Sequence, residues 1–134
     1  MTEDRRKHIL ELLKKGMRLD GRKALEYRKP LKVDYNISIN AEGSAQVTIG
    51  KTVVMAGVKL AIEEPYPDTP DKGLLMVNTE LTPLANPDFI LGPPGIDAIE
   101  LARIIDRGIR ESKIIEMESL CLKKGEKAWS VMID

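Results

Sequence analysis

An alternation of apolar and polar residues over residues 31–62 constrains this chain more than any other feature. A period of two places every second side chain on one face, which is typical of a strand half buried in a sheet. The alternation and the turn residues within it predict three strands: Leu31–Asn40, Ser44–Ile49 and Thr52–Ile62. Glu42–Gly43 supplies the first turn, and Gly50–Lys51 is a two-residue hairpin signal. The third strand is rich in Val and largely apolar, so we expect it to be central in the sheet.

A helical period replaces the strand pattern at residue 96. The spacing predicts a helix over Ile96–Ile115, with Asp97 as its N-cap and Glu100 three residues later in a capping-box arrangement. Its apolar residues recur every three or four positions and form one face: Ala98, Leu101, Ala102, Ile105 and Ile109. We expect the helix to bury this face against the rest of the domain.

The remaining segments complete an order of helix, four strands, helix and strand. Residues 2–16 fit a helix with a narrow apolar stripe, which needs a partner to pack on. Leu74–Leu81 is the fourth strand, and Lys127–Asp134 begins the last one. We divide the chain into an N-terminal helix, 1–16, and a domain part, 17–134. Because the last strand is apolar and no later element covers it, we expect the front part of a longer domain.

The composition excludes several classes of function. The chain has 134 residues, the size of one domain, and its 21 Lys and Arg balance 21 Asp and Glu. A strongly basic coat is absent, so any nucleic-acid contact must come from a local patch. The single cysteine, Cys121, and the single histidine, His8, exclude a disulfide framework and a site with several Cys or His ligands. The two also lie far apart in sequence, which disfavours a Cys–His catalytic pair, and we expect no catalytic residue here.

Neither a metal site nor a targeting segment is expected. Four carboxylates lie in the proline-rich segment before the fourth strand: Glu63, Glu64, Asp68 and Asp71. Two of them could hold Mg²⁺, but a solvated acidic loop is the favoured interpretation. No apolar run reaches the ~18 residues that a membrane span needs, and the N-terminus is charged. We therefore expect a cytoplasmic protein with no cofactor of its own and no membrane contact.

The second helix carries a row of arginines that could bind anions. Arg103, Arg107 and Arg110 are spaced by four and three residues, which places all three on one helix face. Either they are guanidinium forks for phosphates, or they form ion pairs with acidic residues of the same helix. The candidate partners are Glu100, Asp106 and Glu111. The spacing alone favours the ion pairs, because surface pairs of this kind are common.

Several short motifs, in order along the chain, resemble the RNase PH superfamily. They are Arg18–Arg22 with Glu26–Arg28, Glu42–Ala45, Gly50–Thr52 with Val53–Gly57, and Val77–Leu81. Three more are similar to one branch of it, the non-catalytic RNase PH-like subunit of the archaeal exosome: Pro65–Pro70, Gly92–Pro94 and Ile99–Arg107. The resemblance runs from Met17 to Asp134, so it involves nearly the whole chain.

The resemblance implies a fold and a set of partners. The fold is α/β (α+β): an RNase PH-like βαβ sandwich of the ribosomal protein S5 domain 2-like type, with a mixed sheet and a helix packed on it. The family's domain is about twice this length, so the chain matches its first half and the second half is missing. Six such subunits, alternately catalytic and non-catalytic, form a ring that degrades single-stranded RNA from the 3′ end with inorganic phosphate. The implied partners are the homologous catalytic subunit, RNA-binding cap subunits and RNA.

The resemblance also implies roles for particular residues. In the catalytic subunit an arginine pair lies just before the helix, where this chain has Gly95–Ala98, so we expect a non-catalytic subunit. Arg103 and Arg107 match arginines that contact RNA at the shared active site, and Arg110 matches less well. Arg22 and Arg28 are candidates for the ring interface or the RNA path, with loop tethering as an equal alternative. Two other functions stay open: an independent phosphorolytic nuclease, and a structural oligomerisation subunit without RNA contact.

Overall fold

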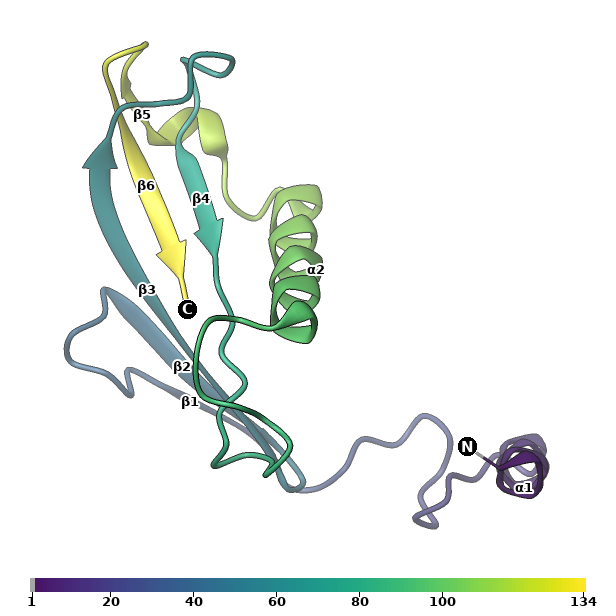
Figure 1. Cartoon of the computed structure of the whole chain (residues 1–134). Coiled ribbons are helices and arrows are strands. Elements are labelled where there is room, and N and C mark those ends of the chain that lie inside the picture. Colours follow the sequence, from purple (N-terminus) through teal and green to yellow (C-terminus); the bar gives the residue numbers. More distant parts are fainter. Residues whose placement is uncertain (1) are drawn as a thin grey trace. The chain divides into compact units, whose positions relative to one another are not determined.

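The fold is a mixed α/β arrangement, as the sequence predicts. The computed structural model describes residues 2–134 (Figure 1). The elements in chain order are α1 Glu3–Lys14, β1 Leu31–Tyr35, β2 Gly43–Ile49, β3 Thr52–Glu63, β4 Leu74–Val77, α2 Ile96–Ser112, the 3₁₀-helix η1 Met117–Leu120, β5 Cys121–Lys123 and β6 Lys127–Ile133. In the part of the chain that the structure describes, no helix has the length and apolar character needed to cross a membrane.

The strands form a mixed sheet in the order β1-β2-β3-β6-β4, and β5 pairs with β6 outside this path. Strand β6 is antiparallel to β3, with Val131 opposite Leu60, and parallel to β4, with Val131 opposite Leu75. Parallel neighbours need a crossover connection, and α2 provides it between β4 and β6. Helix α2 packs on β4 (Figure 1), which completes a βαβ unit. The predicted fold class and the central place of β3 are both confirmed.

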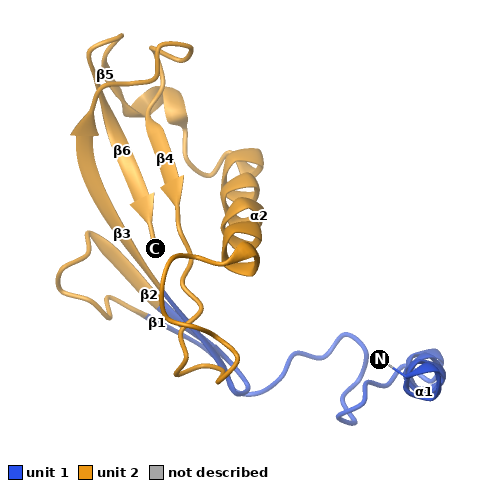
Figure 2. Ribbon diagram, viewed as in Figure 1, with its two compact units in different colours: residues 1–34, 46–55 blue, residues 35–45, 56–134 orange. Residues whose placement is uncertain are grey.

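The chain divides into two compact units (Figure 2). Unit 1 contains the chain up to Asp34 and residues 46–55, and unit 2 contains residues 35–45 and 56–134. Within the helices and strands, the buried apolar side chains belong to β4, α2 and β6 of unit 2: Leu74, Leu75, Ala98, Ala128 and Val131. The βαβ unit is therefore where the core lies.

The first predicted strand is wrong in both length and burial. Strand β1 ends at Tyr35, because Asn36 adopts a left-handed backbone conformation with φ 57°. Its apolar side chains do not form a half-buried face, since Leu31 is 55% and Tyr35 75% exposed. The alternation thus identifies strand geometry correctly, but nothing among residues 2–134 covers the apolar side of β1.

The ends of α2 also differ from the prediction. Gly95 occupies the N-cap position in place of Asp97, and no side chain caps the helix there. The helix ends at Ser112 because Lys113 takes a left-handed conformation with φ 53°. Asp97 instead lies in the first turn, where a negative charge interacts favourably with the helix dipole.

A close contact at Gly73 joins unit 2's sheet to η1, an element that the sequence analysis did not identify. The Gly73 N–H donates to the Met117 carbonyl at 2.7 Å. A Cβ placed on Gly73 would collide with the Leu120 side chain and would lie 2.9 Å from the Trp129 carbonyl oxygen. Only a glycine lets η1 approach the sheet this closely, so the packing of η1 depends on this position.

We expect Gly73→Ala to lower the free energy of unfolding by about 1–3 kcal/mol, because the added methyl overpacks the contact with Leu120. Urea titration of the chain measures this change. The matched control is Gly108→Ala in α2, where a Cβ meets nothing within 4 Å. The control should gain roughly 0.5–1 kcal/mol from helix propensity. Equal stability of the two variants would show that the Gly73 contact is not tight.

Candidate nucleic-acid interface

Helix α2 presents one face to the sheet and the opposite face to solvent. The sheltered stripe runs through Ala98, which is buried, and Ala102 and Ile109, which are half-buried. At 100° per residue, Arg103 lies about 100° from Ala102, on the flank of the helix, and Arg107 lies about 140° from Ala102, on the far side. Both arginines are exposed, so they can reach a partner without disturbing the core.

Arg110 has a different environment, because its guanidinium group already has two partners. Its Nε donates to Asp106 Oδ2 at 2.8 Å, and an Nη donates to the Leu75 carbonyl oxygen of β4 at 2.9 Å. The ion-pair interpretation therefore holds for Arg110, and its hydrogen bond to the Leu75 carbonyl connects α2 to the sheet. Within residues 2–134, Arg103 and Arg107 have neither an ion pair nor a side-chain hydrogen bond.

A groove of about 280 Å³ lies between the residues that follow β4 and the first half of α2. Its polar lining comes from Asn78, Thr79, Arg103 and Asp106, and its apolar lining includes Ala98 and Ala102. Thr79 Oγ1 donates to the Ala98 carbonyl at 2.6 Å and so connects the strand end to α2. The groove offers one guanidinium group and several hydrogen-bonding groups but no cysteine or histidine, which suits binding rather than nucleophilic catalysis.

The groove residues Asn78 and Thr79 were not predicted from the sequence to be parts of a site. The available signal was the change from apolar to polar residues directly after β4, within the motif Val77–Leu81. Asn78 N–H donates to the Ile133 carbonyl of β6 at 2.8 Å, so parallel pairing fixes these residues beside α2. That pairing joins segments more than fifty residues apart and cannot be recognised from local sequence.

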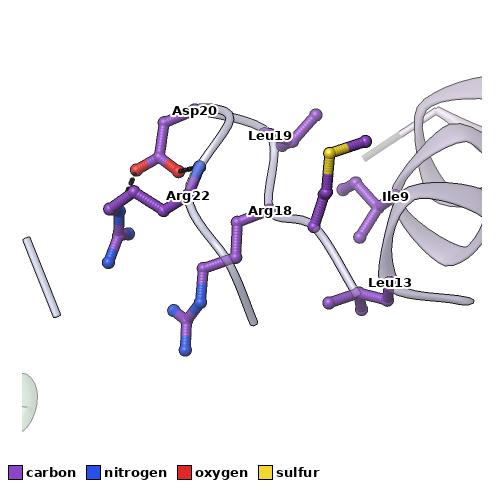
Figure 3. Close-up of a pocket in the computed structure, with 7 residues that line it drawn as sticks. Ile9, Leu13, Arg18, Leu19, Asp20 and Arg22 are labelled. Carbon is purple, nitrogen blue, oxygen red and sulfur yellow. Dashed lines mark hydrogen bonds and ion pairs between the residues drawn. The ribbon is translucent and has the colours of Figure 1, made fainter. Parts of the chain in front are cut away.

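In unit 1, the side chain of Arg22 forms hydrogen bonds within the loop after α1 (Figure 3). Its Nε donates to Asp20 Oδ2 at 2.7 Å and an Nη donates to the Glu26 carbonyl at 2.5 Å. The hydrogen bond from Arg22 lowers the pKa of Asp20 below its ordinary value. Arg28 packs its stem near Gly50, where a Cβ would lie 3.0 Å from the Arg28 Cβ. These contacts fit loop tethering, and a role at the ring interface or the RNA path remains a prediction.

The cysteine and the histidine that were considered for catalysis belong to different units. Cys121 Sγ is 3.9 Å from the Pro70 carbonyl in unit 2, whereas His8 is an exposed residue of α1 in unit 1. Among residues 2–134, no group of three His, Cys, Asp or Glu side chains is arranged to hold a metal ion.

Residues 27–134 match the model of the 3′ exoribonuclease family (RNase PH), domain 1. The chain is 49% identical to the exosome complex component Rrp42 of Methanocella arvoryzae, over 100% of this chain and 51% of that protein. It is 50% identical to the Rrp42 component of Sulfurisphaera tokodaii, over 97% of this chain and 47% of that protein. The resemblance to the archaeal exosome branch of the superfamily is therefore confirmed, and the chain spans about half the length of these relatives.

Solved structures agree with the fold. A chain of the Archaeoglobus fulgidus exosome, solved with RNA bound to the active site, superimposes with a TM-score of 0.87 and 48% identity. That alignment includes 98% of this chain and 52% of the other. A chain of an archaeal exosome core gives a TM-score of 0.77 and 42% identity, over 98% of this chain and 49% of the other.

We expect Arg110→Gln to lower the free energy of unfolding by about 1–2 kcal/mol, because it removes a charged hydrogen bond to the Leu75 carbonyl. The exposed ion pair with Asp106 adds only a few tenths to this loss. Arg103→Gln is the matched control and should change stability by less than about 0.5 kcal/mol, as is usual for surface positions. Thermal unfolding of both variants measures the difference. If both variants lose stability equally, Arg110 does not hold α2 to β4.

Proposed function

Because the chain belongs to the RNase PH family of 3′ exoribonucleases, we propose that it acts as a non-catalytic subunit of a cytoplasmic, archaeal-type exosome. In this role it binds RNA and helps to shape the active site of a homologous catalytic subunit, with which it alternates in a hexameric ring. RNA-binding cap subunits and inorganic phosphate belong to the same proposed assembly.

One observation carries the proposal: two adjacent arginines on α2 are exposed and have no partner among the described residues. Arg103 lines the groove and Arg107 lies one helical turn further, about 6 Å along the axis. Arginines that have no acidic partner retain their charge-assisted hydrogen bonds for an incoming phosphate. Arg110 is excluded from this pair here because its guanidinium already bonds Asp106 and Leu75.

Phosphorolysis defines what the arginines would have to do. A phosphate oxygen attacks the phosphorus of the terminal linkage, the bond to the upstream 3′ oxygen breaks, and that oxygen takes a proton as a nucleoside diphosphate leaves. The RNA must be held in line with the attacking phosphate, and fixed guanidinium groups supply both charge and direction. Arg103 and Arg107 therefore act as positioning residues, and the attacking phosphate is bound by the partner.

Two carboxylates of α2, Asp97 and Asp106, support a non-catalytic role for the site. The helix N-terminus is a favourable place for an anion, but Asp97 puts a carboxylate in its first turn. The groove's one cation, Arg103, has Asp106 beside it in the lining. A second bound phosphate would meet these carboxylates, so the residues of this chain suit contact with RNA better than activation of phosphate.

The double variant Arg103→Glu with Arg107→Glu tests the role of the pair. In the assembled ring we expect slower RNA degradation and weaker RNA binding, since each lost charge-assisted contact costs roughly 1.5–3 kcal/mol. Degradation of labelled single-stranded RNA and binding at several salt concentrations measure these effects. Lys124→Glu with Lys127→Glu, two exposed lysines near β5 and β6, makes the same change in net charge and is the control.

The alternative functions give other results. A purely structural subunit would show an intact ring, unchanged RNA affinity and an almost unchanged melting temperature in the arginine variant, as is usual for surface positions. That result would contradict the contact of Arg103 and Arg107 with RNA and would leave a structural role for the chain.

A separate assay addresses the independent nuclease. The purified chain, incubated with labelled RNA and phosphate, should release no nucleoside diphosphate above a blank reaction, because the residues before α2 lack an arginine pair. Product release that persists through repurification would contradict the non-catalytic assignment.

A further inference from the structure

The zero net charge of the chain conceals a strong separation of charge between its two units. Unit 1 contains twelve Lys and Arg against six Asp and Glu, whereas unit 2 contains nine against fifteen. Unit 1 therefore carries a formal charge of +6 and unit 2 one of −6. Such a charge asymmetry between two parts of a chain is typical of proteins whose basic part binds a polyanion.

Most of the positive charge in unit 1 is available to a ligand. Three of its cations form ion pairs, each with a carboxylate of the same unit: Arg22, Lys29 and Lys32. The other cations of unit 1 have no ion pair within residues 2–134, and all of them are exposed. They lie along α1, the loop after it and the turn at Lys51, so they form a series rather than one cluster.

Two of the four cations of helix α1, Lys7 and Lys14, lie away from its apolar side, whereas Arg5 and Arg6 lie beside that side. A groove of about 320 Å³ lies between α1 and the following loop, with Ile9, Leu13, Met17 and Leu19 among its lining (Figure 3). At 100° per residue, Lys7 and Lys14 lie on nearly the same side of the helix, roughly 140° from Ile9. A protein that filled the apolar groove would therefore leave these two lysines free for a second ligand.

We propose that the exposed cations of unit 1 form a second RNA-binding surface, separate from the arginine pair of α2. The ligand is single-stranded RNA, held through its phosphates; this choice of polyanion, and only this, rests on the proposed function. A series of cations spread along a helix, a loop and a turn can contact successive phosphates of a flexible strand, and binding of this kind does not depend on sequence. The ring of Tyr27, 68% exposed beside Arg28, offers a face on which a base can stack.

The test uses Lys7→Gln with Lys14→Gln, which removes two charges while leaving helix propensity almost unchanged. The control is Lys124→Gln with Lys127→Gln, two exposed lysines of unit 2. Fluorescence anisotropy measures the binding of each chain to a labelled oligoadenylate of about 20 nucleotides over a series of salt concentrations. Circular dichroism confirms that α1 is retained, and poly-L-glutamate serves as an acidic polypeptide competitor.

We expect the α1 variant to lose roughly 1.4 from the slope of log affinity against log salt, which is on the order of 25-fold in affinity at about 0.1 M salt. The control should bind as the unaltered chain does. Equal loss in both variants, no loss in either, or no RNA binding by the unaltered chain would overturn the proposal. So would binding of poly-L-glutamate in preference to RNA, which would assign the surface to an acidic protein.

The same assay on Arg103→Glu with Arg107→Glu separates this proposal from the proposed function. Loss of affinity only in the α2 variant would contradict the proposal of a second RNA-binding surface and would leave the proposed function unaffected. Loss only in the α1 variant would support the second surface, even if the ring assay failed to give Arg103 and Arg107 a role.

Discussion

The contact between α2 and β4 determines which side chains the molecule can offer to a partner. Two alanines, Ala98 and Ala102, allow α2 to lie close to the strand, and Arg110 crosses from Asp106 to the Leu75 carbonyl to hold it there. This contact fixes the rotation of the helix about its own axis. Because the rotation is fixed, Arg107 faces solvent and Arg103 borders the groove. A helix rotated by a third of a turn would bury one arginine and hide the groove.

The parts of the fold that depend on local residue patterns could be predicted from the sequence, and the others could not. Local periodicity identified α2 and placed β3 correctly, since both depend on residues close together in the chain. The burial of β1 could not be predicted that way, because alternation shows which side chains share a face but not whether anything covers it. Its early end depends on the left-handed Asn36, which a strand pattern does not reveal.

The candidate site was predicted only in part for a related reason. The spacing of Arg103, Arg107 and Arg110 indicated one helix face, but only the packing on β4 shows that Arg110 serves the fold while the other two remain exposed. The groove beside them requires the parallel pairing of β4 with β6, a contact between distant segments. The family resemblance singled out Arg103 and Arg107 as candidates for RNA contact, and the packing explains why these two side chains are exposed.

The two units carry opposite formal charges, which bears on how a nucleic acid would approach the molecule. A formal charge of zero excludes a uniformly basic surface, but it does not exclude two oppositely charged parts. The positive unit 1 would bring a nucleic acid to the molecule from a distance, whereas the arginines of α2 would orient it over a short range. The net negative charge of unit 2 would at the same time limit nonspecific contact of a nucleic acid with the surface around the groove.

The most direct measurement is an experimental structure of the proposed assembly, with an RNA strand stalled at the active site of the proposed catalytic partner. The guanidinium nitrogens of Arg103 and Arg107 should lie about 2.7–2.9 Å from phosphate oxygens of the RNA, as charge-assisted hydrogen bonds require. Arg110 should keep its bonds to Asp106 and Leu75. If the RNA passes elsewhere while Arg103 and Arg107 pair with carboxylates of the neighbouring subunit, the central claim is contradicted.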